Sequence, residues 1–195
     1  MRPGVAVLAS LLLCGLNAAL AQGRPNWWVA FDMGAGQIKM STDQTRGKGV
    51  TTFAMGFAGG RKVTDWARVG LHLNGWLLQA FNLNDPTVGE SVSNVNGIVD
   101  VFPIRNRALF LRAGGGLSMY TNERLEGGFG NGPGWEIGGG YEYRIRGNLS
   151  LAPEAGYSAG GLGNGYVSPP AATGLHFSVL EFKLAANYRF RGRAK

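Results

Sequence analysis

The chain has very little cysteine and histidine: Cys14 is the single cysteine among 195 residues, and there are two histidines. One cysteine excludes a disulfide within the chain, and no histidine or cysteine cluster has the spacing of metal ligands. Beyond the extreme N-terminus, no apolar run approaches the ~20 residues that a membrane-spanning helix needs. These absences exclude a disulfide-stapled domain and a bundle of membrane helices, and we expect no metal and no cofactor.

Acidic residues are also scarce, with 12 against 19 lysines and arginines, for a formal net charge of +7. A basic chain suggests a nucleic-acid partner, but the cations are dispersed and form no stripe with interleaved stacking aromatics. Many lie in or beside predicted short connectors: Arg61, Lys62, Arg105, Arg107, Arg146, Arg191, Arg193 and Lys195. We therefore expect basic turns beside a membrane surface and no nucleic acid.

The N-terminus has the pattern of an export signal. Arg2 is followed by an apolar stretch over residues 5–16 and by the small-x-small sequence Ala19-Leu20-Ala21. This predicts cleavage after Ala21, leaving residues 22–195 as one domain without cysteine. The alternative is a lipoprotein box at residues 11–14 with Cys14 acylated, although such a box normally has a small residue where Leu13 stands.

The remainder of the chain alternates apolar with small or polar side chains, and it is rich in glycine, with 33 residues. The alternation predicts strands over residues 27–40, 49–58, 66–82, 92–104, 108–121, 134–145, 149–159 and 175–190. Connectors 59–65, 105–107 and 146–148 are short, whereas 41–48, 83–91, 122–133 and 160–174 are longer. This pattern predicts an all-β fold, an eight-stranded antiparallel up-and-down transmembrane β-barrel, with short periplasmic turns and four longer external loops.

Residues two apart in a strand share a face, and the charged residues fall almost wholly on one face. The predicted lumenal set is Asp32, Arg68, His72, Asp100, Arg112, Glu136, Glu142, Arg144, Glu154, Glu181 and Lys183. An eight-stranded barrel is just wide enough for side chains to fill, and an unpaired buried charge costs several kcal/mol. We therefore expect an ion-pair network that plugs the lumen, built chiefly from Arg68, His72, Asp100, Arg112, Glu142, Glu154, Glu181 and Lys183. A narrow ion path is the alternative.

A secreted soluble sandwich or barrel would also alternate, with its polar face in water. Aromatic residues near strand ends on the apolar row favour the membrane, because they match an interfacial girdle. These residues are Trp27, Trp135, Tyr141, Tyr143 and Tyr188. The predicted export signal would carry the chain out of the cytoplasm.

Three stretches carry a family resemblance: Phe102-Pro103-Ile104, then residues 108–117 (ALFLRAGGGL), and the closing Ala186-Asn187-Tyr188-Arg189-Phe190. They resemble the eight-stranded outer-membrane β-barrel domain family that includes the OmpA transmembrane domain, OmpX and the opacity proteins. The resemblance implies a monomer in the outer membrane of a Gram-negative-type envelope. It also implies that Tyr188 and Phe190 form the C-terminal signal for the assembly machinery, although residues 191–195 follow Phe190 here.

One motif suggests catalysis, because an outer-membrane lipid A deacylase barrel carries a His-x-Ser pair near its last strands, as in His176-x-Ser178 here. Glu181 would have to orient the imidazole, but it falls on the opposite face unless a bulge intervenes. Val179 stands where that family has asparagine. We expect an interfacial histidine and no enzyme, and His72 as a hydrogen-bonded lumenal residue.

The expected function is therefore structural or surface-interacting, with a narrow pore and a lipid A-modifying enzyme as alternatives. Lipopolysaccharide and other outer-membrane lipids are the expected surroundings. A rigid scaffold that presents variable loops places recognition in those loops. The candidate binding residues for an unknown surface ligand are Asn122, Glu123, Arg124, Tyr166, Pro169 and Pro170.

Overall fold

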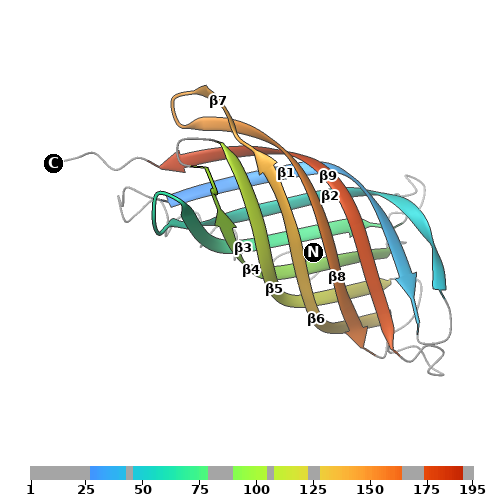
Figure 1. Cartoon of the computed structure of the whole chain (residues 1–195). Helices are drawn as coiled ribbons and strands as arrows, with labels where there is room; N and C mark the ends of the chain where they lie inside the picture. The colour runs from blue at the N-terminus through green and yellow to red at the C-terminus, as the bar shows by residue number, and fades with distance from the viewer. Residues whose placement is uncertain are drawn as a thin grey trace, which may run out of the picture.

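The computed structural model describes residues 27–42, 46–78, 90–104, 108–122, 128–163 and 174–190. They form nine strand segments (Figure 1): β1 Trp27–Ser41, β2 Arg46–Lys62, β3 Ala67–Leu77, β4 Glu90–Val101, β5 Leu109–Asn122, β6 Gly128–Tyr141, β7 Tyr143–Arg146, β8 Leu149–Gly163 and β9 Leu175–Phe190. The described residues include no helix long and apolar enough to cross a membrane.

The sheet closes on itself. The strands from β1 to β6 each pair antiparallel with the next in sequence, as do β8 and β9. β1 also pairs with β9, from Trp27–Phe190 to Ser41–His176. β6 pairs with β5 and β8 and completes the wall, and β7, which follows after Glu142 alone, continues the line of β6 beyond the wall and pairs with β8. The predicted eight-stranded antiparallel barrel is confirmed, and closure leaves the wall without a free edge strand.

Several strands are longer than the alternation predicts. β2 runs over residues 46–62 instead of 49–58, β6 begins at Gly128 instead of 134, and β8 ends at Gly163 instead of 159. Gly128–Pro133 has the composition of a loop, but its backbone pairs with Leu117–Asn122 of β5. Strands pair through backbone hydrogen bonds, so a glycine-rich stretch can extend a strand wherever the neighbouring strand, here β5, offers backbone groups to pair with.

Apolar side chains cover the outside of the barrel, and polar side chains fill the inside. On β9, Phe182 and Leu184 are 64% and 50% exposed, whereas Glu181 and Lys183, which alternate with them, are 3% and 7% exposed. The other long strands repeat the pattern, with Phe53 and Met55 of β2 and Leu109 and Leu111 of β5 on the outer face. The molecule thus reverses the arrangement of a soluble protein, which places charge on the surface.

Glycine on the lumenal row makes room for the charged interior. A Cβ on Gly56 of β2 would lie 2.6 Å from carboxylate Oδ1 of Asp32 and 2.6 Å from Oδ1 of Asn74. Gly75, on the outer row of the adjoining strand β3, has only the carbonyl oxygen of Met55 near its Cβ position, at 4.0 Å. The two glycines are close in the pairing of β2 with β3, because Gly56 pairs with Asn74, the residue before Gly75.

We predict that Gly56→Ala destabilises the barrel by about 1–3 kcal/mol, because the new methyl overpacks the lumen. Gly75→Ala, the matched control, should be neutral or stabilise by up to ~1 kcal/mol, because alanine restricts the unfolded chain. Urea unfolding in phospholipid vesicles, followed by tryptophan fluorescence, measures both. Equal effects of the two substitutions would contradict the account of the crowded lumen.

Candidate functional site

The lumen is the candidate site, and two arginines organise the half nearer the short turns. Nε of Arg68 donates to Oδ2 of Asp100 at 2.6 Å, and Nε of Arg112 donates to Oδ1 of the same carboxylate at 2.8 Å. Asp100 therefore bridges the two guanidinium groups. Arg68 also donates to Glu142, and Arg112 to Glu154 at 3.1 Å. Charge-assisted bonds of this kind are the strong ones.

Aromatic rings close this end of the lumen. The guanidinium carbon of Arg68 lies 4.2 Å from the ring centroid of Trp28 and 5.1 Å from that of Phe110. Trp28 and Phe110 are almost fully buried. The cation is thus held between carboxylates and ring faces, which attract it through their quadrupoles. Arg189, at the turn end of β9, also donates to Glu142.

A histidine and a lysine form the middle of the network. Nδ1 of His72 lies 2.8 Å from Oε1 of Glu136, and its Nε2 lies 3.2 Å from Oδ2 of Asp32. A carboxylate only accepts hydrogen bonds, so the doubly protonated imidazole satisfies both contacts. Nζ of Lys183 lies 2.9 Å from Oδ1 of Asp32 and 3.1 Å from Oε1 of Glu181.

The half nearer the long loops is apolar. Its buried cluster consists of Ile38, Ala54, Trp76, Val92, Tyr120, Leu162, Phe177 and Val179. The rings of Trp76 and Phe177 lie 5.7 Å apart, and Nε1 of Trp76 donates to Oε2 of Glu181 at 2.8 Å. This bond ties the apolar cluster to the ion-pair network, and the indole N–H finds the partner that a buried tryptophan requires.

Negative charge predominates in the described lumen. Six carboxylates, of Asp32, Asp100, Glu136, Glu142, Glu154 and Glu181, face three cations, Arg68, Arg112 and Lys183. Arg189, at the turn end, provides further positive charge, as does His72 when its imidazole is doubly protonated. The described lumen therefore does not share the positive sign of the net charge of the chain, +7.

The middle of the network encloses a small cavity of about 20 Å³, lined by side chains that include His72, Arg112, Glu136, Glu154, Glu181 and Lys183. A volume of this size holds about one water molecule. Oε1 of Glu154 has no hydrogen-bond partner among the described atoms. One water in the cavity would supply that partner, and the cavity is too small for a substrate.

The structure buries all eight residues of the predicted plug in two groups of contacts: Arg68, Asp100, Arg112, Glu142 and Glu154 form one, and His72, Glu181 and Lys183, with Asp32 and Glu136, form the other. The two groups meet around the cavity. The prediction for Arg144 is wrong, because this residue is exposed on β7. β7 pairs with β8 alone among the described strands, so the hairpin projects beyond the wall and Arg144 has no lumen to enter (Figure 1).

Sequence reasoning missed the neutral members of the network. Asn96 and Asn74 donate to Glu136 at 3.0 and 3.3 Å, and Asn74 accepts from Lys183 at 2.8 Å. Alternation places Asn74 on the lumenal row, but an uncharged amide gives no signal of its partners. Their role depends on β6 and β9, which carry Glu136 and Lys183 across the lumen from β3 and β4.

The other predicted sites lie at the two ends of the barrel. Tyr188 and Phe190 end β9 with their rings in an edge contact at 5.1 Å. Asn122 ends β5, and its Nδ2 donates to the hydroxyl of Tyr120 at 3.0 Å. The remaining candidate loop residues, Glu123, Arg124, Tyr166, Pro169 and Pro170, lie outside the described residues, as does the predicted signal over residues 1–21.

His176 and Ser178 are on the outer row of β9, and Glu181 points into the lumen. The register between β1 and β9 is unbroken from His176 to Phe190, so no bulge turns Glu181 toward the histidine. The described residues contain no group of three or more His, Cys, Asp or Glu side chains arranged to hold a metal ion.

No family model and no curated protein matches the chain. Among solved structures it is similar to Neisserial surface protein A, at 15% identity and a TM-score of 0.54, over 84% of this chain and 97% of that one. It is also similar to the outer membrane protein AlkL (13% identity, 88% and 93% covered, TM-score 0.48). A third is the outer membrane protein OprG from Pseudomonas aeruginosa, at 12% identity and a TM-score of 0.44, over 86% of this chain and 97% of that one. The likeness to the first shows the fold of an outer-membrane barrel. The narrower resemblance to OmpA, OmpX and the opacity proteins stays a prediction.

We predict that Arg112→Met destabilises the barrel by about 3–5 kcal/mol, because it leaves the carboxylates of Asp100 and Glu154 buried without this cation. Arg144→Met is the matched control and should change the free energy of unfolding by no more than ~0.5 kcal/mol, since Arg144 is exposed. Urea titration in vesicles measures both. An Arg112→Met protein as stable as the control would show that the network contributes nothing to stability.

Proposed function

We propose that the protein is an outer-membrane barrel with a structural or surface-interacting role, closed to ions and without catalytic activity. The observation that carries the proposal is the reversed polarity of the wall, with exposed apolar side chains outside and paired charges inside. Such a surface supports contact with lipid, because contiguous apolar patches of this extent are rare on soluble proteins.

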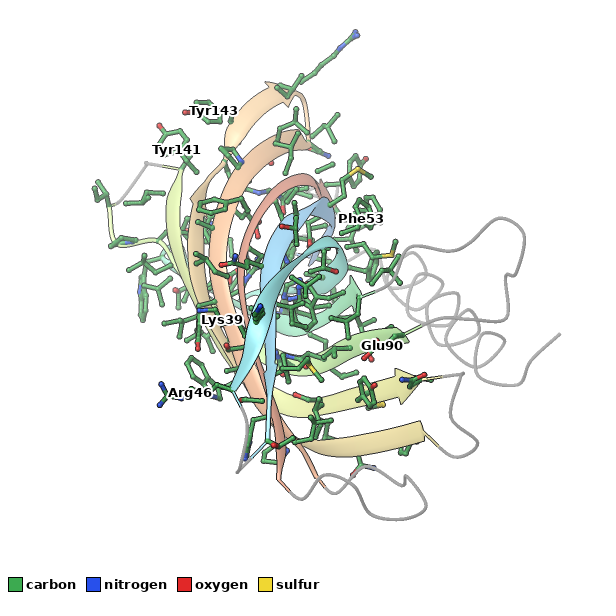
Figure 2. All side chains as sticks on the ribbon, turned by 90° about the vertical axis from the view of Figure 1, so that its right-hand side faces the viewer. Lys39, Arg46, Phe53, Glu90, Tyr141 and Tyr143 are labelled. Atoms are coloured by element: carbon green, nitrogen blue, oxygen red, sulfur yellow. The ribbon has the colours of Figure 1, made fainter. Side chains whose placement is uncertain are left out.

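The residues of the outer row support a bilayer. On β9 the outer row runs from Tyr188 through Leu184 to Leu180 without a charge. Tyrosines mark the turn end, where the rings of Tyr141 and Tyr143 make a tilted contact with their centroids 4.6 Å apart (Figure 2). Trp135 and Tyr157, 5.5 Å apart, lie farther toward the loops on β6 and β8. Aromatic rings prefer the two interfaces of a membrane, so these pairs suit its borders.

The filled lumen argues against the pore. Trp28 and Phe110 occupy one end, Trp76 and Phe177 the other, and the charges between them are held in ion pairs. An ion entering this path would have to displace buried aromatic rings and then break charge-assisted bonds in a lumen of small diameter.

The outer row offers little to a lipid A-modifying enzyme. The mechanism weighed for His176 needs Glu181 to orient its ring, but the carboxylate of Glu181 faces the lumen, where it accepts from Trp76 and pairs with Lys183. Recognition is therefore assigned to the loop end, where the barrel presents its connecting segments. The signal over residues 1–21 and the closing aromatics Tyr188 and Phe190 would serve export and assembly.

The proposed location and orientation can be tested by cysteine labelling. We predict that Arg46→Cys, on the exposed loop-end tip of β2, reacts with a membrane-impermeant maleimide on intact cells. Lys62→Cys, exposed at the turn end of the same strand, should react only after the outer membrane is permeabilised. If Cys14 leaves with the signal, neither protein has another thiol. Labelling of Lys62→Cys alone on intact cells would reverse the orientation, and loss of both proteins to the soluble fraction would overturn the proposal.

A further inference from the structure

A polar patch interrupts the apolar exterior at the loop end of β2, β1 and β9. We call it the rim patch; its members are Gln37, Lys39, Ser41, Arg46, His176 and Ser178. Lys39 pairs with Ser178 on one side and Gly49 on the other, and Ser41 pairs with His176 and Arg46. Cross-strand neighbours on one face have Cβ atoms ~5 Å apart, so these side chains form one contiguous surface.

The rim patch lies on the outer wall rather than in the lumen. Gln37 and Lys39 continue the outer row that begins with Phe31 and Met33, and both are exposed. His176 is also exposed, whereas Phe177 and Val179 beside it are buried in the lumen. Figure 2 shows Lys39 and Arg46 on the β1–β2 hairpin, toward the opposite end from Tyr141 and Tyr143.

The height of the rim patch corresponds to the headgroup layer. From Tyr188 at the turn end, Ser178 is ten residues along β9. Ten residues span ~33 Å along a strand, and a tilt of ~40° reduces this to ~25 Å along the membrane normal, the height of the apolar band of such barrels. Lys39, paired with Ser178, is therefore placed just above the acyl chains.

The chemistry of the rim patch suits a phosphorylated sugar. Lys39 and Arg46 supply cationic donors for phosphate, and Gln37 and Ser178 supply an amide and a hydroxyl for sugar hydroxyls. The described residues that pair with its members on β2, β8 and β9 include Gly49, Thr51, Ala159, Gly161 and Leu180, and none of them is acidic. Charge complementarity thus favours an anion.

We propose that the rim patch binds the phosphorylated sugar headgroup of lipopolysaccharide in the outer leaflet. This inference rests on the proposed function, because it requires the loop end to face outward. The loop end meets the outer leaflet, where phosphate and sugar groups occur on one molecule, whereas a phospholipid offers phosphate without the sugar. The rim patch would fix the barrel within that leaflet and set the surroundings of its loops.

Native mass spectrometry of the detergent-refolded mature chain with bis-phosphorylated lipid A tests the inference. We expect the variant Lys39→Gln/Arg46→Gln to weaken lipid A binding on the order of tenfold, from the loss of two surface charge contacts. Arg61→Gln/Lys62→Gln is the matched control, because it removes the same charge from exposed positions at the turn end. The control should bind as the parent does, and Lys39→Arg/Arg46→Lys should restore binding.

Three results would overturn the inference: equal losses in the two double variants, equal binding of chemically dephosphorylated lipid A to the parent, or phosphatidylglycerol bound as tightly as lipid A and lost in the same variant. The last would assign the patch to phospholipid. Barrel closure is checked separately in each sample by its electrophoretic shift on heating. A parent chain that shows no shift would contradict the proposed function itself, whereas a closed barrel without phosphate preference would contradict only the rim patch.

Discussion

Charges buried inside a narrow closed wall must find partners there, and most features of this protein follow from that constraint. Eight strands leave an interior only as wide as the side chains that fill it. Asp100 meets this demand by bridging Arg68 and Arg112, and Asp32 by bridging His72 and Lys183. Each of these contacts joins different strands, so the network fastens the wall across the lumen as well as around it.

The same constraint explains the glycine content. Lumenal side chains as long as arginine and glutamate need volume, and glycine at facing positions provides it. Gly56 adjoins the carboxylate of Asp32, and a Cβ on Gly114 would lie 3.1 Å from Cγ of Glu136. The cost is a less favourable strand residue. Antiparallel pairing on both sides offsets it, as the continuous register of β5 with β4 and β6 shows.

The number of strands and the face on which most residues lie could be predicted, because apolar and polar side chains alternate along each strand with a period of two residues. The separation of Glu181 from His176 and Ser178 is one such result, since they differ by odd numbers of positions in one regular strand. The partners of a lumenal residue could not be predicted. His72 on β3 meets Glu136 on β6 and Asp32 on β1, and these meetings depend on the stagger of strands around the barrel, which local pattern does not specify.

The ends of the strands were the least predictable part. Composition predicted a loop over Gly128–Pro133, but this stretch pairs with β5 as a strand. Alternation predicted that Arg144 faces the lumen, but Arg144 lies beyond the end of the wall and is exposed. Both differences have one cause: where a barrel strand ends depends on the length of its neighbours, which is a property of the pairing. Alternation alone predicted the buried face correctly for residues such as Arg112 and Lys183, whose strands are paired with a neighbour on both sides.

Planar-bilayer conductance tests most directly whether the lumen is filled as described. The purified, refolded barrel is added at high protein load beside a water-filled porin as the positive control. The paired charges and the rings of Trp28 and Trp76 predict no stepwise current from this chain. Reproducible unitary steps that scale with the amount of inserted protein would contradict the plugged lumen and restore the pore.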